Sequence, residues 1–214
     1  MKTFLIATRN AHKVGEIRAI LGGEFQFLTL NDFPGAPAVV EDAATFAGNA
    51  TKKAVELAQW LAARPGPRAA GLSVLADDSG LEVDALQGAP GVHSARFAAV
   101  DHLKDGNTPD ADNNAKLLRL LREVPAEQRA ARFRCVLALT PVGAAPVTEL
   151  FDGACEGRID LAPRGQGGFG YDPLFIPHGF AQSFAELGEA TKNQLSHRAK
   201  ALGKLQAWLG TQAT

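Results

Sequence analysis

The glycine-rich segment 167–173 places two aromatic side chains next to an acidic one. Glycines let a backbone approach a ligand closely and adopt positive φ angles. Phe169 and Tyr171 offer flat faces for stacking, and Asp172 adds an acceptor beside them. Three cationic donors follow in one short stretch: Lys192, His197 and Arg198. These groups have the chemistry that holds a nucleobase, and the alternative is a turn that closes a core beside solvated basic residues.

The pair Asp77-Asp78 is the most prominent acidic cluster of the chain. Residues 72–76 are mostly apolar and residues 81–86 alternate, which predicts two strands with a turn over residues 77–80 between them. Adjacent carboxylates are costly to bury unpaired, and a divalent cation such as Mg²⁺ or Mn²⁺ would remove that cost. The alternative is an ordinary Asx-type turn in a hairpin.

A second acidic pair, Glu41-Asp42, precedes Thr45, a residue type that caps helices. Partnership with the helix dipole is the plainer local interpretation of this pair. Asn49 and Lys53 stand four residues apart on the expected helix, so they share one of its faces. The apolar stripe of the same helix is Ala50, Ala54, Leu57, Ala58 and Leu61.

The chain starts with an apolar stretch, residues 4–7, followed by a polar turn and a helix-like pattern. The first amides of a helix and the positive end of its dipole form a ready anion site. Asn10 and Lys13 flank this expected helix start, where an amide and an ammonium group could meet a phosphate. The alternative for Lys13 is an ordinary surface lysine.

The other patterns predict an α/β fold in a single domain, residues 1–214, lobed around a cleft. A helix is expected over residues 112–124, and a strand around Phe133–Leu139 that pairs with residues 147–154. A last helix is capped by Ser196, and a loop covers residues 62–71. There is no internal repeat and no obvious interdomain linker.

Composition excludes several classes of protein. The net charge is −1, with 46% apolar and 21% charged residues, which is typical of soluble globular proteins and argues against polymeric nucleic acid as a partner. No apolar run has the length of a membrane span. Cys135 and Cys155 lie outside zinc-site spacings, so buried thiols and a cytoplasmic setting are expected. Neither a P-loop nor a dinucleotide-binding glycine motif is present.

Six motifs occur in order along the chain: Thr8-x-Asn10-x-x-Lys13, Thr45-Phe46-x-x-Asn49-Ala50-x-x-Lys53-Ala54, Asp77-Asp78-Ser79-Gly80-Leu81, Pro90-Gly91-x-x-Ser94-Ala95-Arg96, Gly168-Phe169-Gly170-Tyr171-Asp172-Pro173 and Ser196-His197-Arg198. On these motifs the chain closely resembles the inosine/xanthosine triphosphate pyrophosphatases, enzymes that destroy deaminated purine nucleotides. The resemblance runs from Met1 to about Leu209.

The resemblance implies a long, twisted mixed β-sheet flanked by helices, in two lobes around a substrate cleft, and a homodimer. It also implies Mg²⁺-dependent hydrolysis of ITP, dITP and XTP to the nucleoside monophosphate and pyrophosphate, with Mn²⁺ as a substitute metal. The partners would then be purine nucleoside triphosphates, without nucleic acid or membrane.

The resemblance also implies roles for individual residues. The triphosphate would be held by Thr8, Arg9, Asn10, Ala11, His12, Lys13 and Lys53. Asp78 would be the proton acceptor and a metal ligand, Glu41 the second metal ligand, and Ser79 a substrate contact. Phe169 would stack on the base, and the wall around it would be completed by Gly170, Tyr171 and Asp172. The purine edge would be read by Lys192, His197 and Arg198.

The chain departs from the family pattern at few positions. Arg9 stands where members often have glycine. Many members carry consecutive glutamates where Val40-Glu41 stands, so Asp42 is the alternative second metal ligand. Two rival functions remain open, a nucleotide-binding regulatory module without turnover and a phosphatase that releases orthophosphate from simple phosphoesters.

Overall fold

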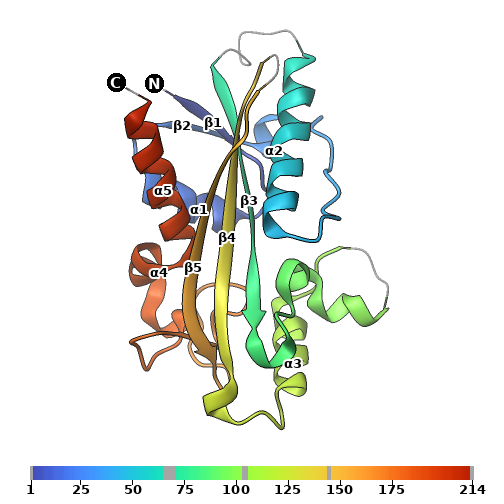
Figure 1. Ribbon diagram of the computed structural model, residues 1–214, viewed down its shortest axis with the longest axis vertical. Coiled ribbons are helices and arrows are strands. Elements are labelled where there is room, and N and C mark those ends of the chain that lie inside the picture. The colour runs from blue at the N-terminus through green and yellow to red at the C-terminus, as the bar shows by residue number, and fades with distance from the viewer. Residues whose placement is uncertain (1, 65–70, 103–105, 144–145, 213–214) are drawn as a thin grey trace. The chain divides into compact units, whose positions relative to one another are not determined.

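A computed structural model describes residues 2–64, 71–102, 106–143 and 146–212 of the chain. In these ranges six strands form one open sheet, in the order β2-β1-β3-β4-β5-β6. The strands are β1 (Thr3–Ile6), β2 (Gln26–Thr29), β3 (Leu72–Val83), β4 (Ala130–Pro141), β5 (Glu149–Ile159) and β6 (Phe175–Pro177). The helices are α1 (Ala11–Leu21), α2 (Phe46–Ala62), α3 (Asp110–Leu120), α4 (Phe184–Leu195) and α5 (His197–Thr211) (Figure 1).

The sheet is mixed. β1 pairs in parallel with β2 and with β3, whereas β5 and β6 are antiparallel. This arrangement confirms the expected α/β class with a mixed sheet. The chain divides into two compact units, the first made of Met1–Asp78, Cys135–Asp152 and Lys200–Thr214, the second of Ser79–Arg134 and Gly153–Ala199.

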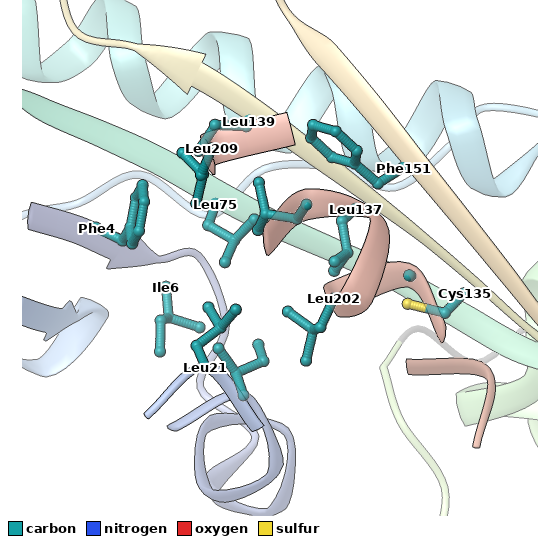
Figure 2. Packing of buried hydrophobic residues seen from close by; sticks show 13 residues of the cluster. Phe4, Ile6, Leu21, Leu75, Cys135, Leu137, Leu139, Phe151, Leu202 and Leu209 are labelled. Carbon is teal, nitrogen blue, oxygen red and sulfur yellow. The ribbon is translucent and has the colours of Figure 1, made fainter. Parts of the chain in front are cut away.

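The core of the first unit gathers the inward side chains of β1 and β3 with the apolar faces of α1 and α5. Phe4 and Ile6 of β1 face this cluster, where Leu21 and Leu202 meet them from the two helices (Figure 2). Successive side chains of a strand point to opposite faces. Leu5, which is also fully buried, therefore lies on the other face of β1.

Helix α2 lies on the opposite side of β1 from α5 (Figure 1). It begins where predicted, because Oγ1 of Thr45 accepts the N–H of Gly48 at 3.0 Å and satisfies an amide that the helix leaves unpaired. All five residues of its predicted apolar stripe are buried: Ala50, Ala54, Leu57, Ala58 and Leu61. The polar pair Asn49 and Lys53 is buried as well, although both side chains carry hydrogen-bonding groups.

The core of the second unit is rich in aromatic rings. The ring centroids of Phe133 and Phe175 lie 4.7 Å apart, and those of Phe175 and Phe184 lie 5.3 Å apart. The buried guanidinium of Arg129 donates to three main-chain carbonyl groups, those of Leu121, Val124 and Asp160. Since a buried charge is tolerated only when it is hydrogen-bonded, Arg129 fixes these loops around the core.

The expected turn over residues 77–80 is wrong. These residues belong to the continuous strand β3, and Asp77 and Asp78 are only 2% and 7% exposed. Turns lie at the surface because their backbone polar groups need water. Here the polar side chains find partners inside the protein, so the strand runs through them.

Other expectations hold with shifted bounds. The predicted helix 112–124 is α3, Asp110–Leu120, and the predicted strand 147–154 is β5, Glu149–Ile159. Cys135 and Cys155 are buried free thiols, as predicted. Most of the expected loop 62–71, residues 65–70, lies outside the described ranges. Among the described residues, no helix combines the length and the apolar character that crossing a membrane requires.

Candidate functional site

The start of α1 is a capped, accessible helix N-terminus. Oδ1 of Asn10 accepts the N–H groups of His12 at 2.9 Å and Lys13 at 3.2 Å, and Oγ1 of Thr8 accepts the N–H of Asn10. Four of the predicted phosphate-binding residues are exposed there: Arg9, Asn10, Ala11 and His12. The first turn of α1 therefore presents the positive end of the helix dipole to solvent.

Lys13 is not an ordinary surface lysine. Its ammonium group forms an ion pair with the carboxylate of Asp77, which lies 64 residues further along the chain. The other oxygen of that carboxylate, Oδ2, accepts a hydrogen bond from the thiol of Cys135 at 3.2 Å. No local pattern in the sequence points to these contacts, because Lys13, Asp77 and Cys135 lie on three separate elements, α1, β3 and β4.

Lys53 lies at the centre of the acidic groups. Its Nζ donates to the main-chain oxygen of Asp77 at 2.7 Å and to Oε2 of Glu41 at 3.0 Å. The same atom is 3.6 Å from Oδ1 of Asp78. The structure thus brings together three of the predicted site residues, Glu41, Lys53 and Asp78. Asn49 supports them, since its Oδ1 accepts the N–H of Ala43 and ties the segment after Glu41 to α2.

The two residues of the pair Glu41-Asp42 have different environments. The carboxylate of Asp42 is exposed and forms an ion pair with Lys52 at 2.6 Å. Its hydrogen bond and charge attraction to Lys52 lower the pKa of Asp42 below its usual value. Glu41 instead shares Lys53 with Asp78, so Glu41 is the one of the two that lies among the buried acidic groups.

Asp78 is a buried carboxyl group that keeps one oxygen atom without a hydrogen-bond partner among the described residues. Burial raises its pKa to about 6, and the charge of Glu41 adds to the rise, while the charges of Lys53 and Lys13 and the polar side chain of Asn49 oppose it. Its Oδ2 atom is buried without a hydrogen-bond partner among the described residues. An unsatisfied buried acceptor carries a desolvation cost that a donor or a cation would remove.

The donor set fits a divalent cation that is shared with a ligand. No cluster of three or more His, Cys, Asp or Glu side chains suited to a metal occurs in the described ranges. Mg²⁺ is commonly held by one or two carboxylates together with substrate phosphates rather than by an all-protein cage. Asp78, with its unsatisfied oxygen, and Glu41 can supply those carboxylates.

In the second unit, the carboxylate of Asp172 anchors the glycine-rich loop. Its Oδ2 accepts the N–H of Phe169 at 2.9 Å and pairs with Nζ of Lys192 at 2.6 Å. Gly168 has φ +75°, and a Cβ atom there would stand 2.2 Å from Oδ2 of Asp172. Only glycine therefore fits at this close approach.

Phe169 is the accessible aromatic residue of the loop. Its side chain is partly exposed, and Nζ of Lys192 lies 4.3 Å from its ring centroid, within cation–π range. Tyr171 differs, because it is 4% exposed and its hydroxyl donates to the main-chain oxygen of Ser94 at 2.9 Å. Burial raises the pKa of Tyr171 above its usual value. Phe169 thus offers a partly exposed ring, and Tyr171 supports the loop from the core.

The two remaining predicted donors begin helix α5. Ser196 caps that helix as predicted, since its Oγ accepts the N–H of Ala199 at 3.2 Å. The ring of His197 stacks on Phe133, with centroids 4.9 Å apart. Arg198 is 1% exposed, and its Nη2 donates to Oγ of Ser79 at 2.9 Å. The structure thus joins Arg198 to Ser79, the residue that directly follows Asp78.

Comparisons with known proteins show which family and which structures the chain resembles. The sequence model of the Ham1 family matches residues 4–208. The dITP/XTP pyrophosphatase of Geobacillus kaustophilus is 50% identical over 206 residues, which cover 96% of this chain and 93% of the relative. That of Geobacter sulfurreducens is 47% identical over 213 residues, covering 99% and 98%. The structure of a HAM1 protein from Coxiella burnetii has a TM-score of 0.82 at 36% identity, covering 99% of this chain and all of the other.

Proposed function

The chain belongs to the Ham1 family, and from that premise we propose that it is a pyrophosphohydrolase that converts ITP, dITP and XTP to the nucleoside monophosphate and pyrophosphate. The observation that carries the proposal is Asp78, a buried carboxyl group with a pKa of about 6, an unsatisfied oxygen and two lysines nearby. The relatives that are named dITP/XTP pyrophosphatase support dITP and XTP as substrates.

The chemistry of the first unit suits the triphosphate. Lys13 and Lys53 bring two ammonium groups, and the start of α1 adds the positive end of a helix dipole. Asp78 is ionised above pH 6 and accepts the proton of the water that attacks the α-phosphorus. The bond from that phosphorus to the bridging oxygen breaks, and pyrophosphate leaves. Mg²⁺ bound by Asp78 and Glu41 would neutralise phosphate charge.

The chemistry of the second unit suits a 6-oxopurine base. Phe169 offers a partly exposed ring for stacking, and the same unit holds the N–H donors of Lys192, His197 and Arg198. The 6-oxo group of inosine and xanthosine accepts such donors, whereas adenine presents an amino donor at the same position. A site built to donate hydrogen bonds rejects an analogue that cannot accept them. We expect a cytoplasmic homodimer.

A nucleotide panel with product identification tests the proposal. The protein is incubated with Mg²⁺ and ITP, dITP, XTP, GTP or ATP, and the products are separated by chromatography while pyrophosphate is measured. We expect the monophosphate and pyrophosphate from the first three nucleotides and little from ATP. Nucleotide binding without turnover would support a regulatory module instead. Release of orthophosphate from a simple phosphoester would support a phosphatase.

A further inference from the structure

The peptide groups of Gly170 are held by two side chains of α3. Oδ2 of Asp110 accepts the N–H of Gly170 at 2.6 Å, and Nδ2 of Asn114 donates to its carbonyl oxygen at 3.0 Å. Asp110 and Asn114 are four residues apart, so they stand one above the other on the same face of the helix. One helix face therefore takes both polar groups of a single residue that is 56 to 60 positions away in the chain.

The adjoining face of α3 is fastened to the 3₁₀ segment η3 (Gly91–His102). Oδ1 of Asn113 accepts the N–H of Ala98 at 2.8 Å, and Nζ of Lys116 donates to the main-chain oxygen of Phe97 at 2.7 Å. Asn113 and Lys116 are 2% and 7% exposed. Because Asn113 and Lys116 are buried and hydrogen-bonded, α3 is a fixed support for the two side chains that reach Gly170.

The loop needs such a support. Gly168 and Gly170, on either side of Phe169, have φ angles of +75° and +62°. Glycine loses more conformational freedom on folding than any other residue, so two of them leave the intervening residue weakly restrained. On one side, Asp172 accepts the N–H of Phe169. On the other side, Asp110 and Asn114 supply the restraint.

We propose that Asp110 and Asn114 are positioning residues that fix the ring of Phe169 for base stacking and so contribute to the selection of 6-oxopurines. This inference rests on the proposed function, because it concerns the base-binding end of the same substrate. Neither side chain has to touch the base. Their effect passes through the main chain of Gly170 to the orientation of the neighbouring aromatic ring.

Steady-state kinetics of Asp110→Ala and Asn114→Ala test the inference. We expect KM for ITP to rise about tenfold in each variant, the loss typical of one hydrogen bond to a charged or well-placed group, with kcat within about twofold. The ratio of kcat/KM for ITP to that for ATP should fall. Inhibition by inorganic tripolyphosphate, which has no base, should stay unchanged.

Two matched variants distinguish a loss of the positioning of Phe169 from a general disruption of the fold. Asp110→Asn keeps an oxygen that can accept the N–H of Gly170, so its KM should lie close to that of the wild type. Asp112→Ala removes an exposed carboxylate from the same turn of α3 and should change nothing. If Asp110→Ala does not fold, Asn114→Ala carries the test, because it removes the other bond to Gly170.

Hydrogen exchange of the amide of Gly170, followed in the free protein, gives a readout that does not depend on turnover. Exchange should be slow in the wild type and at least about tenfold faster in Asp110→Ala, because the hydrogen bond that protects the amide is lost. The inference is overturned if the wild type hydrolyses ITP but the variants keep both the wild-type ratio of kcat/KM for ITP to that for ATP and the slow exchange of the Gly170 amide. The proposed function is overturned if the wild type does not hydrolyse ITP. In that case the exchange rate of the Gly170 amide still shows whether Asp110 restrains Gly170.

Discussion

Replacing Asp78 with asparagine should abolish turnover and, at the same time, make the folded protein more stable above pH 6. The amide has nearly the same shape as the carboxyl group but cannot accept a proton at neutral pH. Loss of a general base lowers kcat by about a hundredfold or more. The gain in stability has a separate cause, which is the buried position of Asp78 on β3.

The size of the gain follows from the pKa. Folding raises the pKa of Asp78 from 3.8 to about 6, mainly because burial disfavours the charged form. Such a difference corresponds to about 3 kcal/mol of unfolding free energy. Below pH 3.8 the group is neutral in both states and costs nothing. The cost appears as the pH rises from 3.8, and it is complete once the pH exceeds the folded value of about 6.

Urea unfolding at pH 4 and pH 8, with a chelator present to keep divalent cations away, measures this difference. We expect Asp78→Asn to exceed the wild type by about 3 kcal/mol at pH 8 and by less than about 1 kcal/mol at pH 4. Asp112→Asn, an exposed carboxyl group, serves as the control and should show neither effect. Equal stability of Asp78→Asn and the wild type at pH 8 would refute the reasoning that Asp78 is held in an environment unfavourable to its charge.

Two further pairs of substitutions, each a test with its control, concern other parts of the site. Mg²⁺ should raise the Tm of the wild type, and this rise should be smaller in Glu41→Gln. The rise should persist in Asp42→Asn, because the wild-type carboxylate of Asp42 pairs with a surface lysine. An equal effect of both substitutions would contradict the assignment of Glu41 as a metal ligand. Gly168→Ala should destabilise the fold by about 1–2 kcal/mol for the positive φ alone, and more because its Cβ would collide with Asp172. Gly203→Ala, in α5 with no atom within 4 Å of the added Cβ, is the control and should be neutral or stabilising; the same urea assay decides.

Local signals in the sequence predicted the elements well where the physical cause is local. Thr45 and Ser196 cap α2 and α5 as expected, because a side-chain oxygen and an amide three residues away are sufficient for the motif. The buried stripe of α2 follows in the same way from the helical repeat of its apolar residues. Glu41 and Asp78, the two expected metal ligands, both lie next to the ammonium group of Lys53.

Contacts between residues that are distant in the sequence could not be predicted from the sequence. Asp110 and Asn114 carry no motif that points to Gly170, and only the packing of α3 brings them to it. Tyr171 has the residue type of a stacking partner, but its hydroxyl is taken by Ser94 in the core. The position of an aromatic residue in the sequence does not show whether its ring will be buried or exposed to a ligand.

The incorrect turn at residues 77–80 shows how the fold creates the chemistry of the site. In a turn, both aspartates would face water. In a continuous strand, adjacent side chains point to opposite faces. Asp77 meets Lys13 and the thiol of Cys135, so both of its oxygens are satisfied. Oδ1 of Asp78 lies 3.6 Å from Nζ of Lys53, and Oδ2 has no hydrogen-bond partner among the described residues. Two identical neighbours in the sequence thus acquire different roles, one as a structural ion pair and the other as the group left free for a proton or a metal.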